Sequence, residues 1–271
     1  MRDTFEWAAG SVAGRDHRHS MKNSHDAWQA EVTDRGLVAV VCDGCGSGEH
    51  SEVGAWIAAE MVVKQTMAAI QQDPKYFSPE RVAHGLERIQ RGVLAHIAAL
   101  SDAMRFSFSQ IVSDYFLFTV LGVAVTPENT TVFGLGDGVY WLNGHRNDLE
   151  AENNSPDYLG YLLTQPQGNP GLKPYHFLKT SEVRTILLGT DGAVQLAAAA
   201  DKNIPGKNEK IGPVSQFWEK DLYFKNPFAL GHRLNLINRD SMAVDYEAKT
   251  VREEHGPLSD DTTLAVVRRG K

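Results

Sequence analysis

Cysteine, long apolar runs and an excess of basic charge are scarce or missing in this 271-residue sequence. The only cysteines, Cys42 and Cys45, form one C-x-x-C pair. Such a pair can be a redox site or half of a zinc site, but a structural zinc site needs four ligands and no second Cys pair follows. We therefore expect two reduced thiols, with Cys42 packed in the interior and Cys45 in a loop.

Membrane and export signals are also missing. No apolar run approaches the roughly 20 residues of a membrane helix, and Met1–Gly10 lacks the charged start and apolar stretch of a signal peptide. A cytoplasmic protein without a membrane partner is the expectation.

The charge pattern argues against nucleic acid. The net charge is -7, and acidic and basic residues are interspersed rather than gathered in a basic stripe. With 42% hydrophobic residues, the chain can bury a sizeable core. The simplest organisation is one domain spanning residues 1–271.

The first half predicts a hairpin followed by two long helices. Asp26–Val32 and Leu37–Cys42 flank a turn cluster, which favours a β-hairpin. Two series of apolar residues then recur at helical spacing. The first is Trp56, Ala59, Val63, Met67 and Ile70; the second is Val82, Leu86, Ile89, Val93, Ile97, Leu100 and Met104.

The second half predicts further strands. They cover residues 116–125, 130–135, 139–142, 183–188 and 264–268, with a short helix over 193–200. Residues 143–182 and 201–245 lack clear periodicity and predict irregular excursions, with short helices near 214–222 and 228–238. Strands, long helices and more strands indicate an α+β protein with antiparallel sheets, packed as a layered sandwich.

Aspartates recur at the ends of these strands. Asp43 follows one apolar strand, Asp191 follows another, and Asp260 precedes the last. Hard cations such as Mg²⁺ and Mn²⁺ prefer oxygen ligands, and a following glycine lets a backbone carbonyl approach the ion. One Asp-Gly is commonly a plain turn, but three strand-end aspartates together indicate a metal site. Asp137, between two glycines, fits a hairpin turn, and we interpret it as structural.

These motifs resemble, in order, those of the metal-dependent serine/threonine protein phosphatases, the PPM or type 2C family, and of its compact bacterial branch. The matching segments are Gly14-Arg15-Asp16-His17, Asn23-Ser24-His25-Asp26-Ala27, Asp43-Gly44-Cys45-Gly46, Gly136-Asp137-Gly138, Asp191-Gly192 and Asp260-Asp261-Thr262-Thr263. The resemblance implies a four-layer α-β-β-α sandwich of two antiparallel sheets flanked by long helices. It also implies hydrolysis of phosphoserine and phosphothreonine in phosphorylated protein substrates.

The resemblance further implies two or three Mn²⁺ or Mg²⁺ ions. Asp43 would bridge two ions, Asp191 and Asp260 would complete one, and the Gly44 carbonyl would serve the other. Asp114 stands where many relatives help to hold a third ion. Two such ions, about 3.5–4 Å apart, would share a water, lower its pKa and position a phosphate for in-line attack.

Two further residues of the opening segment match family positions. Asp26 matches the aspartate that orients the water, and His17 matches a histidine frequent in this branch. The alternative for His17 is a solvated loop histidine, and for Asp114 an exposed loop carboxylate.

The sequence departs from the family pattern at three positions. His25 replaces a common Glu or Gln, Cys45 replaces a histidine proposed as general acid, and Gln195 replaces another aspartate. Two rival functions therefore stay open. One is a regulatory module of this fold that binds phosphorylated partners with little or no catalysis. The other is a two-metal phosphodiesterase acting on nucleotides, against which the lack of a nucleic-acid surface argues.

Overall fold

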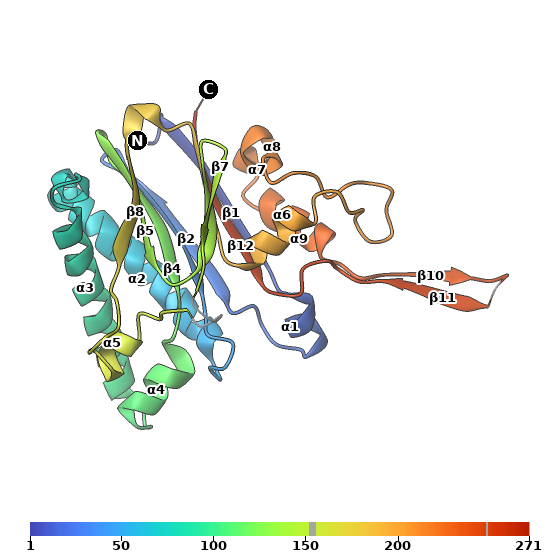
Figure 1. Ribbon diagram of the computed structural model, residues 1–271, viewed down its shortest axis with the longest axis horizontal. Helices are drawn as coiled ribbons and strands as arrows, with labels where there is room; N and C mark the ends of the chain where they lie inside the picture. The colour runs from blue at the N-terminus through green and yellow to red at the C-terminus, as the bar shows by residue number, and fades with distance from the viewer. Residues whose placement is uncertain (152–155, 248, 271) are drawn as a thin grey trace.

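The computed structural model describes residues 1–151, 156–247 and 249–270, and shows two antiparallel sheets packed face to face (Figure 1). The first sheet has the order β1 (Phe5–Val12), β12 (Thr262–Arg269), β9 (Thr185–Gly189), β6 (Gly138–Leu142) and β7 (His145–Leu149). The second has the order β2 (Asp26–Val32), β3 (Leu37–Asp43), β4 (Val120–Val125), β5 (Asn129–Leu135) and β8 (Lys173–Lys179).

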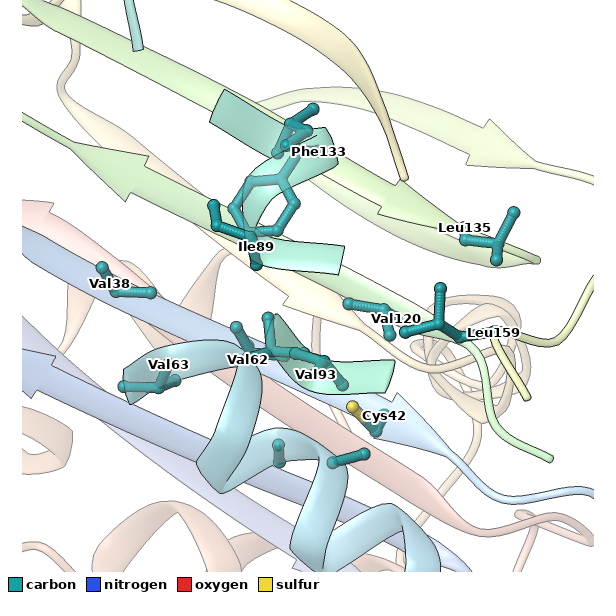
Figure 2. Close-up of a cluster of buried hydrophobic side chains, with 14 of the residues drawn as sticks. Val38, Cys42, Val62, Val63, Ile89, Val93, Val120, Phe133, Leu135 and Leu159 are labelled. Carbon is teal, nitrogen blue, oxygen red and sulfur yellow. The ribbon is translucent and has the colours of Figure 1, made fainter. Parts of the chain in front are cut away.

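Alternating side chains of β3 explain why this strand is buried from Leu37 to Cys42. Its even-numbered members, such as Val38 and Cys42, pack against helices, whereas Leu37, Ala39 and Val41 pack between the two sheets. Successive side chains of a strand point to opposite faces, so a strand covered on both sides is apolar at every position. Figure 2 shows Cys42 among the aliphatic side chains of this layer. The expectation of a packed, unpaired Cys42 is confirmed.

Two long helices cover the outer face of the second sheet. They are α2 (Ser51–Gln72) and α3 (Val82–Ala103), joined through the 3₁₀ turn Pro74–Phe77. Ile89 and Val93 of α3 and Val62 of α2 meet Phe133 and Val120 of the sheet (Figure 2). The predicted helices are therefore correct. Trp56 and Leu100 were wrongly placed on the buried faces, because they are 55% and 38% exposed at the margins of the apolar stripe.

Short helices cover the other sheet. They are α6 (Gly192–Ala198), α7 (Gln216–Glu219), α8 (Leu222–Lys225) and α9 (Ala229–Ile237). Leu196, Phe217 and Leu230 pack there against β1, β9 and β12. The four-layer α-β-β-α sandwich is thus observed (Figure 1), with long helices on one face and short ones on the other.

The prediction that residues 143–182 are irregular was wrong at two places, because the strands β7 and β8 lie within this segment. Both β7 and β8 lie at sheet edges, where one side of the backbone has no partner strand within the described part of the sheet. His145–Leu149 is largely exposed, and β8 carries Pro174, which edge strands tolerate. Neither shows the apolar periodicity of a buried strand. Residues 152–155 of the same stretch lie outside the described residues.

Several smaller elements complete the chain. They are α1 (Arg15–His19), α4 (Phe108–Tyr115), α5 (Tyr161–Thr164), the 3₁₀ turn Thr180–Glu182, and a two-stranded ribbon of β10 (Ser241–Asp245) and β11 (Thr250–Glu254). The ribbon projects from the body beside α1 and α9 (Figure 1). Within the described residues, no helix combines the length and apolar composition needed to cross a membrane.

Candidate metal centre

The strand-end aspartates meet at one end of the sandwich, where the two sheets face each other. Asp26 begins β2 and Asp43 ends β3, and the two are cross-strand partners in the second sheet. Asp191 follows β9 and Asp260 precedes β12, which are neighbouring strands of the first sheet. Carboxylates far apart in the sequence are therefore brought together because both sheets end at this edge.

Asp137 joins the same group, contrary to its interpretation as a turn residue. The strands on either side of it, β5 and β6, belong to different sheets, so the segment crosses between the layers instead of closing a hairpin. Gly136 and Gly138 have φ values of 92° and 131°, which favour glycine and allow this abrupt crossing. The Gly-Asp-Gly pattern fits both a hairpin turn and a crossing between sheets. The two are distinguished only by knowing that β5 and β6 belong to different sheets.

Asp43, Asp137, Asp191 and Asp260 line a pocket of about 170 Å³, whereas Asp26 is buried behind its strand partner Asp43 and does not line it. Its walls are His17, His25, Asp43, Gly44, Gly46, Asp137, Pro156, Tyr158, Asp191, Asp260 and Asp261. A buried water needs only about 10–15 Å³ by this kind of measure, so the space holds several waters or ions. Of the residues predicted for the site, Asp43, Gly44, Asp191, Asp260 and His17 all line it.

Burial, reinforced by repulsion between neighbouring carboxylates, raises the pKa values of the aspartates in the pocket. Burial and the carboxylates of Asp26 and Asp191 raise the pKa of Asp43 well above its usual value. Burial and the charge of Asp260 raise the pKa of Asp191 to about 7. Burial likewise raises the pKa of Asp137. Clustered carboxylates disfavour one another's ionised forms, and a divalent cation among them relieves that cost.

Asp261, which the sequence did not single out, organises the N-terminal segment around the pocket. Its Oδ1 accepts the Gly14 N–H at 2.7 Å, and its Oδ2 accepts the His25 N–H at 2.5 Å. The His17 Nδ1 lies 2.8 Å from the same Oδ2. Because a carboxylate only accepts, Nδ1 carries the hydrogen and Nε2 is left as the free ring nitrogen. The sequence signal that could have identified Asp261 is its place directly after Asp260 in the Asp260-Asp261 pair.

Asp26 and His25 each present a buried polar atom without a hydrogen-bond partner among the described residues. The Thr190 hydroxyl donates to Asp26 Oδ2 at 2.6 Å, whereas Asp26 Oδ1 has no such partner. His25 Nδ1 is also unpartnered, and burial together with the nearby His17 lowers the His25 pKa. Buried polar atoms are normally satisfied. Orphaned acceptors beside a carboxylate cluster fit a cation and its water ligands.

Gly44 is fixed by close backbone approach. A Cβ atom there would lie 2.8 Å from the Ser51 carbonyl oxygen and 3.0 Å from that of His25. The Gly44 N–H donates to the His25 carbonyl at 3.1 Å, and the Thr119 N–H donates to the Asp43 carbonyl at 2.8 Å. These bonds hold the segment just after β3 in place beside the pocket.

The remaining sequence candidates lie around the pocket rather than in it. Asp114 sits in α4, where its carbonyl accepts the His50 N–H at 2.9 Å, and it is not among the residues that line the pocket. Its role in a third metal site stays a prediction. Gln195 accepts the Ser259 N–H and hydroxyl at 2.8 and 2.9 Å, and so holds the loop that leads to Asp260.

Cys45 lies close to the pocket in a polar setting. Its Sγ is 3.1 Å from the Ser47 hydroxyl. Burial raises the pKa of this thiol, but hydrogen bonds from Ser47 and Tyr158 outweigh that effect and leave the pKa below its usual value. Cys45 lies in a loop, as expected, and its side chain is buried next to Val112 and Leu117.

Comparison with known proteins agrees with this architecture. The sequence profile of the protein phosphatase 2C family matches residues 13–220. A bacterial serine phosphatase is similar in structure, with a TM-score of 0.53, 11% identity, and coverage of 98% of each chain. The serine/threonine phosphatase Stp1 from Staphylococcus aureus has a TM-score of 0.54 and 11% identity, and the match covers 98% of this chain and 96% of that one. At such identities the structural likeness shows the fold. No curated protein is detectably similar in sequence.

Proposed function

Because the chain belongs to the protein phosphatase 2C family, we propose that it hydrolyses phosphoserine and phosphothreonine in proteins with the help of Mn²⁺ or Mg²⁺. The observation that carries this proposal is the pocket in which Asp43, Asp191 and Asp260 converge from both sheets. An all-oxygen set of this kind suits hard divalent cations rather than zinc.

The proposed ligands are Asp43, the Gly44 carbonyl, Asp191 and Asp260, with Asp137 in the same wall. Asp43 has the central place because its carboxylate interacts with those of Asp26, Asp191, Asp260 and Asp137 alike. When bound, two divalent cations supply positive charge that lowers the pKa of water and neutralises phosphate oxygens. A third ion near Asp114 is an extension of this proposal.

Asp26 and His17 are the proposed proton-handling groups. The Thr190 hydroxyl fixes Asp26 Oδ2, so Oδ1 is the atom available to orient a water and accept its proton. Asp261 holds His17 Nδ1 and leaves Nε2 free of that bond. In the imidazolium form Nε2 also carries a hydrogen, which it can donate to a leaving alkoxide, and the ring then becomes the neutral Nδ1–H form that Asp261 holds. This pairing offers a general acid although Cys45 replaces the histidine found in some relatives.

One observation favours the regulatory alternative. His25 stands where an acidic or amide side chain is common in the family, and its buried ring packs against His17 with centroids 4.3 Å apart. A neutral imidazole offers Nδ1 to a cation but brings no negative charge. If His25 lowers the affinity for one of the two ions enough, the protein would bind phosphorylated partners without hydrolysing them.

The test is release of phosphate from p-nitrophenyl phosphate and from a phosphothreonine peptide. We expect activity in Mn²⁺ or Mg²⁺ and none in EDTA. Asp43→Asn should keep the fold and lose more than about 100-fold in turnover, since removing even an outer partner of a metal ligand costs about 10- to 100-fold.

Asp201→Asn is the matched control, because it removes one carboxylate from an exposed turn. Activity that survives EDTA would refute metal dependence. Peptide binding without turnover in any metal would support the regulatory alternative, and unchanged turnover with unchanged metal content in Asp43→Asn would refute the ligand assignment.

A further inference from the structure

A second group of metal-binding side chains lies outside the pocket, where the ribbon leaves the body. It consists of His19 at the end of α1, Asp240 just before β10, and His255 just after β11. One ligand atom from each residue lies within 4.8 Å of the others. Three segments far apart in the sequence thus place two imidazoles and one carboxylate together.

Two distances in this group, one to each carboxylate oxygen of Asp240, are close to those between ligands of a tetrahedral ion. His19 Nε2 is 3.3 Å from Asp240 Oδ2, and His255 Nδ1 is 3.5 Å from Asp240 Oδ1. Ligands about 2.0–2.1 Å from a tetrahedral metal are about 3.3 Å from one another. The two imidazole rings meet edge to face with centroids 5.6 Å apart, and both side chains are about half exposed, so the rings have room to turn toward one ion.

Asp240 is held in position for such a role. The Gly256 N–H donates to its Oδ1 at 2.9 Å, which leaves Oδ2 directed to His19. A backbone bond of this kind orients a carboxylate without consuming its second oxygen. The side chains of His19, Asp240 and His255 are 51%, 30% and 48% exposed, so an ion can enter and keep a water as fourth ligand.

One cation already competes for the carboxylate. Arg18 Nη2 lies 3.5 Å from Asp240 Oδ1, and its side chain is 30% exposed. An ion at Oδ2 would be repelled by this guanidinium, whereas Glu253, 3.9 Å from His255 Nε2, would partly offset the repulsion. The competition predicts that removing the Arg18 charge strengthens binding.

We propose that His19, Asp240 and His255 form a separate transition-metal site, suited to Zn²⁺, that fastens the base of the β10–β11 ribbon to α1. The ligand chemistry distinguishes this site from the pocket, because imidazole nitrogens favour Zn²⁺ over Mg²⁺. A two-stranded ribbon alone is marginally stable in water, so a clamp at its base contributes order that its own hydrogen bonds do not supply.

The ion would also act on the proposed active site through α1. His17 lies on the same five-residue helix and contacts Asp261 at the pocket. Holding His19 therefore holds the helix that carries His17. The clamp connects the ribbon to one wall of the pocket without entering it.

The experiment is a titration of the full chain with Zn²⁺, measured by isothermal titration calorimetry. Excess Mg²⁺ is present throughout so that it occupies the oxygen ligands of the pocket. We expect one further equivalent of Zn²⁺, and Co²⁺ in its place should show the visible absorption of a tetrahedral site. His19→Ala and His255→Ala should each weaken binding at least about tenfold. His145→Ala, which removes an exposed histidine of β7, is the matched control and should bind as the wild type does.

Two further measurements sharpen the test. Arg18→Gln should bind about threefold to tenfold more tightly, and Zn²⁺ should slow amide exchange in Ser241–Asp245 and Thr250–Glu254 of the wild type but not of His19→Ala. The proposal is overturned if no Zn²⁺ binds beyond the Mg²⁺-occupied pocket or if both histidine variants keep the equivalent. It is equally overturned if Arg18→Gln binds more weakly or the ribbon exchanges equally fast with Zn²⁺.

Discussion

Replacing Asp191 by Asn should stabilise the metal-free protein while it weakens metal binding. The reason is that burial, together with the neighbouring carboxylates of Asp260 and Asp137, raises the pKa of Asp191 from the usual 3.8 to about 7. The pKa of Asp191 is higher in the native state than in the unfolded state, so the protonated carboxyl favours the native state. This contribution to stability is complete below a pH of about 4 and is lost as the pH rises through about 7. At a pH of about 7.5 without metal, the native state therefore carries most of the cost of this charge.

The magnitude follows from the size of the shift. A rise of about three pKa units corresponds to about 4 kcal/mol. The amide of the Asp191→Asn variant would still be partly buried, and its neighbours would still repel one another, so we expect a net gain of about 2 kcal/mol. For a chain of 271 residues, that gain raises the melting temperature by about 3–4 °C.

The assay is thermal unfolding of wild type and Asp191→Asn at a pH of about 7.5, first in EDTA and then in Mn²⁺. We expect the variant to be the more stable protein in EDTA and to gain less from Mn²⁺, because an ion that binds only the native state stabilises it more when its affinity is higher. At a pH of about 5 in EDTA the difference should shrink. Asp201→Asn is the control and should unfold like the wild type. A variant no more stable than wild type in EDTA, or one that gains equally from Mn²⁺, would refute the argument.

Three further substitutions test individual contacts. Gly44→Ala should destabilise the protein by about 1–3 kcal/mol in denaturant unfolding, because its Cβ meets the Ser51 carbonyl at 2.8 Å; unchanged stability would show that this segment shifts freely. Gln195→Ala leaves the Ser259 N–H and hydroxyl without their acceptor, and should lower Mn²⁺ affinity about tenfold in a binding titration; full affinity would mean that the loop needs no support. Asp114→Asn should reduce turnover far less than Asp43→Asn, since it does not line the pocket; an equal loss would place Asp114 at the reacting centre.

Local sequence patterns were sufficient to predict those helices and strands whose structure depends on residues close together in the chain. The predicted hairpin of residues 26–42 corresponds to β2 and β3, and the long helices correspond to α2 and α3. In these segments apolar periodicity and turn residues act within a few residues of one another. The family pattern similarly located the aspartates that converge, because their motifs sit at strand ends.

Patterns that depend on distant partners were missed. Asp137 was interpreted as a hairpin residue because Gly-Asp-Gly does not reveal that β5 and β6 belong to different sheets. The role of Asp261 depends on its contacts with Gly14, His17 and His25. These residues lie more than two hundred positions away in the sequence, so no local pattern indicates the contacts. The edge strands β7 and β8 carry polar side chains and so lack the alternation that identifies a buried strand.

We propose above all that the carboxylates at the edge of the two sheets hold divalent cations for phosphate hydrolysis. The most direct measurement is a crystal of active protein grown with Mn²⁺, examined by anomalous diffraction. We expect peaks in the pocket at bonding distance from Asp43, Asp191 and Asp260. A crystal of protein that hydrolyses the phosphothreonine peptide but shows no peak beside these aspartates would contradict it.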